Sequence, residues 1–136
     1  MRVTSNRGFY RSGLEKKFAE MSPRGVFQYE PYKIPYVVHR DYIPDFVHEG
    51  AHKTYLVECK GYFRVGDTQK YKAIRDCVEE HIELVFLLSD KNKKVRKGSK
   101  MTMEQWCAKE GLACFTLDSM DELLKYMGVS NGSDAS

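Results

Sequence analysis

The alternation of apolar and polar residues is clearest at residues 53–60, where KTYLVECK predicts a β-strand. Successive side chains of a strand point to opposite faces. Leu56, Glu58 and Lys60 therefore share one face of this segment, while Tyr55 and its alternate neighbours share the other. The pattern indicates an inner strand that places charged side chains beside apolar ones.

A second strand is predicted at residues 82–88, which form a continuous apolar run. Such a run is typical of a strand buried on both faces. Between the two strands, residues 67–81 place Tyr71, Ile74 and Val78 in helical register. A strand, a helix and a strand in this order predict a parallel pair with a crossover helix, and hence an α/β fold.

Weaker patterns predict the remaining elements. Ser12 and Glu15 fit a capping box at the start of a helix. Three prolines between residues 31 and 44 favour edge positions or strand starts for the segments around them. The expected elements are helices at 12–21, 102–110 and 119–127 and strands at 36–39, 43–47 and 114–117.

The length and composition fit one globular domain. The chain has 136 residues, of which 42% are hydrophobic and 30% are charged. We expect a single domain over residues 1–127, with a disordered tail at 128–136. No window contains the ~18 consecutive apolar residues of a membrane helix, and we see no signal peptide. We therefore expect a cytoplasmic protein with no membrane partner.

The cysteines are scattered without a C-x-x-C pair (Cys59, Cys77, Cys107 and Cys114). In a chain without an export signal this spacing argues against disulfides. A structural zinc site would need distant cysteines to converge. Free, mostly buried thiols are the expected state.

Positive charge is concentrated in part of the chain, although the formal net charge is only +3. Residues 91–100 contain no acidic residue and six basic ones: Lys91, Lys93, Lys94, Arg96, Lys97 and Lys100. Such a run indicates a surface that faces a polyanion such as nucleic acid. A solubilising loop would give the same pattern.

The candidate chemistry lies in Pro44-Asp45, followed after twelve residues by Glu58-Cys59-Lys60. This is the arrangement of PD-(D/E)xK nucleases. Phosphodiester hydrolysis needs a hard cation that neutralises charge and lowers the pKa of the attacking water, and Mg²⁺ prefers carboxylate oxygens and water as ligands. Asp45 and Glu58 would supply those oxygens, and Lys60 would stabilise the transition state. A surface salt bridge between Asp45 and Lys60 is the alternative.

Four stretches also resemble one family. They are YRSGLEKK at 10–17, YIPDF at 42–46, VECKG at 57–61 and KGSKMTMEQWCAKEGL at 97–112, and PYKIPYVV at 31–38 is similar to the family's bridge between domains. The chain resembles endonuclease I of T-odd bacteriophages, a family of Holliday junction resolvases in the PD-(D/E)xK superfamily.

The resemblance implies a restriction-endonuclease-like core with a mixed central sheet flanked by helices. It implies the catalytic set Glu15, Asp45, Glu58 and Lys60, with Mg²⁺ or Mn²⁺ bound by Glu15, Asp45, Glu58 and the carbonyl of Cys59. It also implies a domain-swapped homodimer, bridged at about residues 29–36, that cuts four-way and other branched DNA in the host cytoplasm. This chain departs from the family in its acidic C-terminus.

The resemblance and the basic residues together suggest DNA contacts at Arg11, Lys16, Lys94, Arg96, Lys97 and Ser99. The Lys97-Gly98-Ser99 sequence fits a turn whose amides bind phosphate. Trp106 and Phe115 are assigned to the core.

Two other functions fit parts of the sequence. His48-Glu49-x-x-His52 matches the zinc hydrolase signature H-E-x-x-H, which requires a helix. Gly50 within the motif and the strand that follows favour a turn instead. A basic nucleic-acid-binding module without catalysis is the other alternative, although it would not need carboxylates that face a lysine.

Overall fold

The computed structural model describes residues 10–130, and contacts divide the chain into two compact units at residues 40 and 41. We call them the N-terminal unit and the C-terminal unit and describe each by itself. The single domain expected over residues 1–127 stays a prediction. Of the tail expected at 128–136, residues 131–136 lie outside the described part.

The C-terminal unit is built on a four-stranded mixed sheet with the strand order β1-β2-β3-β4. Its strands are β1 (Phe46–Glu49), β2 (Thr54–Lys60), β3 (Ile82–Leu88) and β4 (Ala113–Phe115). β1 and β2 form an antiparallel hairpin, whereas β2, β3 and β4 are parallel. The parallel pair predicted from residues 53–60 and 82–88 is confirmed, as is a mixed sheet flanked by helices.

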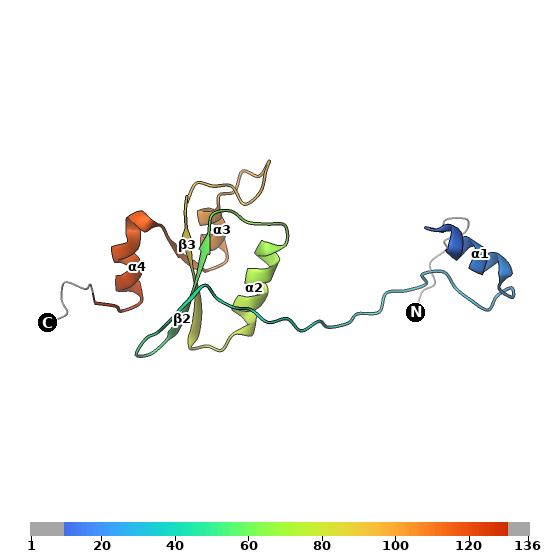
Figure 1. Ribbon diagram of the computed structural model, residues 1–136, viewed down its shortest axis with the longest axis horizontal. Coiled ribbons are helices and arrows are strands. Elements are labelled where there is room, and N and C mark those ends of the chain that lie inside the picture. Colours follow the sequence, from blue (N-terminus) through green and yellow to red (C-terminus); the bar gives the residue numbers. More distant parts are fainter. Residues whose placement is uncertain (1–9, 131–136) are drawn as a thin grey trace. The chain divides into compact units, whose positions relative to one another are not determined.

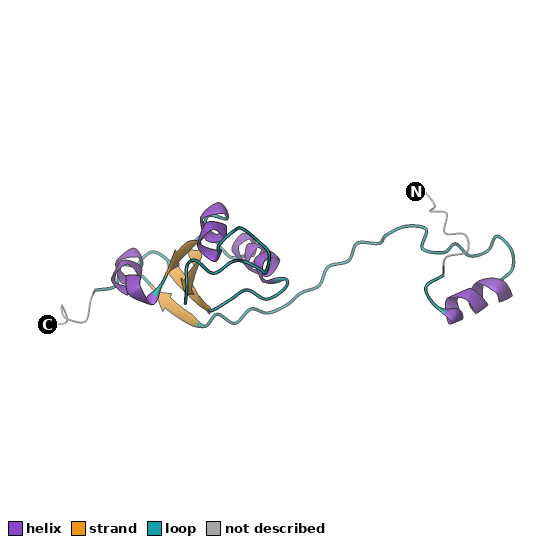
Figure 2. Ribbon diagram, turned by 90° about the horizontal axis from the view of Figure 1, so that it is seen from above, coloured by secondary structure: helices purple, strands orange, loops and turns teal. Residues whose placement is uncertain are grey.

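Helices cover both faces of this sheet (Figures 1 and 2). They are α2 (Asp67–Cys77), α3 (Met103–Lys109) and α4 (Met120–Tyr126), the last preceded by a short 3-10 helix at Leu117–Ser119. Tyr71 of α2 and Trp106 of α3 pack on Phe86 of β3, at 5.1 and 6.1 Å between ring centroids. On the other face, Tyr126 of α4 packs against Tyr55 of β2 at 6.1 Å.

The main core lies between the sheet and the α2 and α3 helices. Its most buried side chains include Phe86, Met103 and Cys107, each fully buried. Phe86 is the register partner of Glu58, and Leu88 is the partner of Lys60. Because neighbouring strands keep paired residues on one face, Glu58 and Lys60 lie on the face that these helices cover. The sequence thus folds its two central charged residues toward the core.

The core assignments of the two aromatic residues have different outcomes. Trp106 is 5% exposed and belongs to the core, as predicted. Phe115 is only partly buried and packs against Tyr126 on the opposite face, at 5.5 Å between ring centroids.

The N-terminal unit contains one helix within its described residues, α1 (Gly13–Met21). Ser12 caps it by accepting a hydrogen bond from the Glu15 amide. Aromatic pairs join the helix region to the following turn: Tyr10 with Tyr29, and Phe18 with Phe27. None of the α1 residues is fully buried, so much of this helix is available for further contacts.

Two strand predictions need correction. Residues 36–39 form no strand, and no helix or strand occurs over residues 33–44. β1 begins at Phe46 rather than Ile43. Proline lacks the backbone N–H that a sheet requires, so Pro35 and Pro44 disfavour strand pairing at the two ends of this segment.

The helix expected at residues 67–81 also ends earlier, at Cys77, because Val78 adopts an extended backbone. All four cysteines are free thiols, as predicted, but Cys59 and Cys77 are exposed and only Cys107 is fully buried. Over residues 10–130, the helices are too short or too polar to cross a membrane.

Candidate active site

Glu58 is the centre of the candidate site. It lies in β2, and the residue is only 7% exposed. A buried carboxylate is costly unless it is paired or hydrogen-bonded, and both of its oxygens are engaged. Tyr42 Oη donates to Oε1 at 2.5 Å, and Tyr71 Oη donates to Oε2 at 3.0 Å. Two tyrosine hydroxyls therefore hold the Glu58 carboxylate in place.

Asp45 lies immediately before β1. Phe46 pairs with Val57 in the antiparallel register, so the same register extended by one residue sets Asp45 opposite Glu58. The Asp45 side chain is fixed there, because its Oδ2 accepts a hydrogen bond from the Cys59 amide at 2.8 Å. Desolvation, together with the charges of Asp45 and Glu58, raises the pKa of the Cys59 thiol. The carboxylates of Asp45 and Glu58 therefore both lie close to Cys59.

Lys60 is held on the same face by acidic neighbours. Its Nζ lies 3.3 Å from Asp67 Oδ2 and 3.8 Å from Glu58 Oε2. It also lies over the Tyr71 ring, 5.1 Å from the centroid. The alternative salt bridge between Asp45 and Lys60 does not occur among the ion pairs of the described residues. Lys60 instead joins the site through Glu58.

Sequence reasoning missed Tyr42, Tyr71 and Asp67. Asp67 is 8% exposed and accepts hydrogen bonds from the Arg64 amide, at 2.9 Å, and from Lys60. Tyr42 is part of the YIPDF stretch, but nothing in its spacing indicated a bond to Glu58. Tyr71 was placed only in helical register. The contacts of these residues depend on how α2 packs on the sheet, which periodicity does not encode.

Asp45 and Glu58 are the residues of this site that could hold a hard divalent cation. Lys60 balances at most one of the negative charges of Glu58, Asp67 and Asp45. A carboxylate can accept about four hydrogen bonds or ligand contacts, so Glu58 keeps acceptor capacity beyond its two tyrosines. Mg²⁺ commonly binds one or two carboxylates plus water and substrate oxygens. Residues 10–130 contain no group of three or more His, Cys, Asp and Glu side chains placed to hold a metal ion of any kind. A cation at Asp45 and Glu58 would therefore need further ligands from outside this group, such as water and substrate oxygens.

Glu15, the fourth member of the expected set, belongs to the N-terminal unit. Its backbone amide completes the first half of the predicted capping box through Ser12. Within the described residues no reciprocal bond from the Glu15 side chain to the Ser12 amide is present, and Glu15 Oε1 is buried without a hydrogen-bond partner there. Helix capping therefore accounts for the Glu15 backbone but not for its carboxylate. An unpaired buried oxygen is the kind of atom that a ligand would satisfy.

The H-E-x-x-H motif does not form a zinc site. His48 and Glu49 end β1, and a hairpin turn follows, closed by the Gly50 amide donating to the Lys53 carbonyl at 2.8 Å. A Cβ at Gly50 would lie 2.9 Å from that same carbonyl oxygen. The motif requires both histidines on one helical face, so the zinc hydrolase alternative is wrong.

The basic loop, which contains the basic residues of the 91–100 segment, begins next to the site. Ser89 follows β3 and its amide donates to the Lys60 carbonyl at 3.1 Å. Buried Val95 pins the loop by pairing its amide with the Met101 carbonyl at 3.0 Å. The loop therefore leaves the sheet at the end where Lys60 lies, and its basic side chains are exposed.

The predicted DNA contacts of this loop differ in availability. Arg96 and Lys97 are exposed. Lys94 Nζ donates to the Lys100 carbonyl at 3.1 Å. Ser99 uses its amide and its hydroxyl within the loop, bonding the Arg96 carbonyl and the Met101 amide. Of the loop residues proposed to contact DNA, Lys94, Arg96 and Lys97 are therefore exposed, whereas Ser99 is partly buried and uses its polar groups within the loop.

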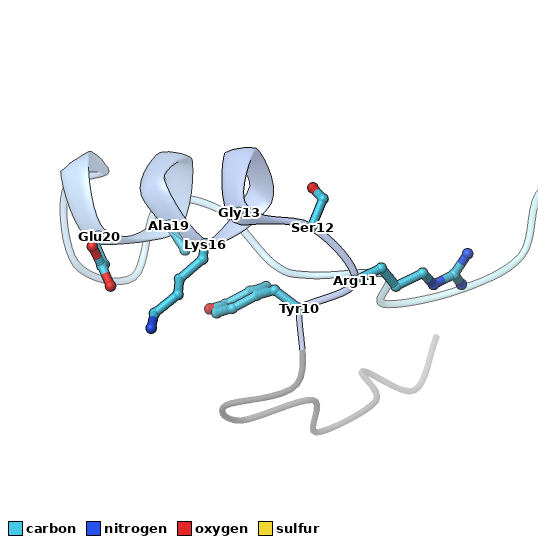
Figure 3. A pocket seen from close by; sticks show the side chains of 7 residues that line it. All are labelled: Tyr10, Arg11, Ser12, Gly13, Lys16, Ala19 and Glu20. Atoms are coloured by element: carbon cyan, nitrogen blue, oxygen red, sulfur yellow. The ribbon is translucent and has the colours of Figure 1, made fainter.

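In the N-terminal unit, a pocket of about 500 Å³ borders the start of α1 and is lined by Arg11 and Lys16, among others (Figure 3). Lys16 extends from the helix beside Tyr10, whereas Arg11 precedes the helix. Arg11 also forms an ion pair with Glu30 at 2.8 Å, with both side chains substantially exposed. Exposed pairs of this kind contribute little free energy.

Comparison with known proteins agrees with the chemistry of this site. The family model described as phage endonuclease I matches residues 1–125. Endodeoxyribonuclease 1 of Enterobacteria phage T3 is 36% identical over 118 residues, which cover 82% of this chain and 73% of that protein. Endonuclease I of Escherichia phage T7 is 35% identical over 112 residues, which cover 77% and 71% of the two chains.

An acidic site on a mixed sheet, with Glu58 and Asp67 buried and Asp45 exposed, together with these relatives defines a deoxyribonuclease that cuts within DNA. The alternative of a binding module without catalysis is therefore wrong. The chain belongs to the phage endonuclease I family.

Proposed function

We propose that this endonuclease is a Holliday junction resolvase of DNA recombination, which hydrolyses phosphodiester bonds at four-way junctions and other branched DNA with Mg²⁺ or Mn²⁺. The observation that supports the proposal most strongly is the placement of Glu58, Asp45 and Lys60 around one end of the sheet. In this proposal the core has the PD-(D/E)xK arrangement, and DNA is its partner.

The residues would divide the chemistry as follows. Asp45, Glu58 and the Cys59 carbonyl would bind the cation, and Glu15 would add a further carboxylate. A bound Mg²⁺ would supply charge neutralisation at the phosphate and a lower pKa for the attacking water. Lys60 would donate to that water or to a phosphate oxygen, and its contact with Asp67 would keep the ammonium in place.

Glu15 is the reason to propose a domain-swapped homodimer. It belongs to a different unit from the other site residues, and its buried oxygen has no partner among the described residues. Apolar side chains are exposed in α1 and in the segment that follows: Leu14, Met21, Ile34, Val37 and Ile43. Exposed apolar surface of this kind marks an interaction site. A second copy of the chain would cover it and would bring Glu15 to the carboxylates of its partner.

A symmetric dimer would hold two such sites, and four-way junctions present two equivalent strands for paired cuts. Basic side chains lie in both units, at Arg11 and Lys16 and at Arg96 and Lys97. These side chains would contact DNA phosphates without reading sequence. The arrangement therefore favours recognition of DNA shape over recognition of base order.

Cleavage of a labelled synthetic four-way junction, beside a linear duplex of the same sequence, tests this proposal. With Mg²⁺ we expect symmetric nicks in two opposing strands of the junction and little cutting of the duplex, because only the branched DNA spans both sites. Equal cutting of the two substrates would show that the nuclease is not selective for branched structure.

A further inference from the structure

Two tyrosine hydroxyls hold the Glu58 carboxylate from different parts of the C-terminal unit. Tyr42 precedes β1 and bonds Oε1 at 2.5 Å, whereas Tyr71 belongs to α2 and bonds Oε2 at 3.0 Å. The two rings pack edge to face, with centroids 6.2 Å apart and planes at 84°. Each oxygen of one carboxylate thus has its own donor, which fixes both the position and the plane of the group.

The direction of these hydrogen bonds is determined by the chemistry. Burial raises the pKa of both tyrosines, and the hydrogen bonds and charge of Glu58 raise it further. A phenol hydroxyl has a proton to donate and a carboxylate oxygen has lone pairs to accept it, so the tyrosines donate and Glu58 accepts. Charge-assisted hydrogen bonds to a carboxylate are among the stronger ones in proteins.

Packing alone does not explain the two hydroxyls. Tyr71 is 1% exposed and lies among Phe63, Phe86 and other core residues, where a phenylalanine would pack equally well. Tyr42 is partly exposed and packs against that core from outside. The hydroxyls are useful at these positions because Glu58 needs donors that leave its remaining lone pairs open.

Groups that orient a metal ligand usually affect metal affinity strongly. Their removal typically weakens affinity or activity by about 10–100-fold, because an unconstrained carboxylate must be ordered when the cation binds. We propose that Tyr42 and Tyr71 are positioning residues that clamp both oxygens of Glu58 and so preorganise it to bind the divalent cation. This inference rests on the proposed role of Glu58 as a metal ligand.

Tyr42 adds a link to the rest of the chain. It is three residues before Asp45, so one short segment contributes both a donor to Glu58 and the second carboxylate. The clamp therefore fixes the two carboxylates relative to each other. Tyr42 acts on the cation through Glu58 and is not itself a catalytic residue.

Calorimetric titration of the full-length protein with Mn²⁺, without DNA, tests the clamp. Tyr42→Phe and Tyr71→Phe should each weaken Mn²⁺ binding by about 10–100-fold, and the effects should not simply add, since both act on one carboxylate. Tyr126→Phe is the matched control, because the Tyr126 hydroxyl donates to Glu83 on the opposite face of the sheet. Its Mn²⁺ affinity should equal that of the parent protein.

A second measurement, thermal unfolding in EDTA, separates positioning from folding. Unchanged Mn²⁺ affinity in both phenylalanine variants, with lowered unfolding temperatures, would show that the tyrosines are structural and overturn the clamp. If Tyr71→Phe does not fold, Tyr42→Phe decides alone. Glu58→Gln separates the proposed metal ligand from the proposed clamp. Weaker Mn²⁺ binding in Glu58→Gln but not in the tyrosine variants rejects only the clamp. Unchanged binding in Glu58→Gln rejects the metal ligand and the clamp together.

Discussion

Glu58→Gln should lower the rate of DNA cleavage by at least about a hundredfold, because a bound cation supplies several kcal/mol of transition-state stabilisation and about 1.4 kcal/mol corresponds to a factor of ten. Binding of a four-way junction should persist or become tighter, since the substitution removes negative charge near the phosphates. Single-turnover cleavage and a gel-shift titration on the same preparation measure both quantities.

The fold should survive this substitution. Glutamine retains one oxygen that can accept from a tyrosine, although its amide cannot accept from the other, at a cost on the order of 1–3 kcal/mol. Glu49→Gln is the matched control, because Glu49 is exposed at the far end of the β1–β2 hairpin. It should cleave at the parent rate. Normal cleavage by Glu58→Gln would place the active site elsewhere.

Mixing two inactive variants should restore cleavage if the dimer is domain-swapped. In a swapped dimer, one chain gives Glu15 and its partner gives Glu58 to each site. A dimer of Glu15→Gln and Glu58→Gln therefore has one site with both defects and one intact site. After co-refolding at equal amounts, about a quarter of the parent number of sites should be intact. The mixture should nick one strand of a junction without a paired cut.

The control mixture combines Asp45→Asn with Glu58→Gln. Both residues belong to the C-terminal unit, so each site of that mixed dimer retains one defect and no activity should return. The swap is wrong if the Glu15→Gln and Glu58→Gln mixture stays inactive although both variants dimerise. Full activity of Glu15→Gln alone would instead remove Glu15 from the site.

The sequence contained enough information to predict the sheet that holds Glu58 and Lys60. The alternation at residues 53–60 and the apolar run at 82–88 depend on local burial, which periodicity reports directly. The proximity of Asp45 and Glu58 was predictable because a hairpin of that length brings the two ends together. The strand expected at 36–39 failed because Pro35 precedes it and no strand among residues 10–130 pairs with its backbone.

The side chains around Glu58 were not predictable in the same way. Helical register placed Tyr71 toward the core, but its bond to Glu58 depends on how α2 crosses the sheet. Asp67 opens α2 and reaches back to Lys60, a contact set by the turn between β2 and α2. For Glu15, the capping box explained the backbone, and only the structure revealed the unpaired carboxylate oxygen. Tertiary packing decides all three.

The rate of junction cleavage as a function of Mg²⁺ concentration, for the parent protein and Asp45→Asn, tests the central claim most directly. The exposed neighbour substitution Asp41→Asn serves as the control. We predict a saturable rate that EDTA abolishes in the parent and in Asp41→Asn, and no cleavage at any concentration by Asp45→Asn despite unchanged junction binding. Cleavage by the parent in EDTA, or parent-like cleavage by Asp45→Asn, would contradict a metal-dependent active site at Asp45, Glu58 and Lys60.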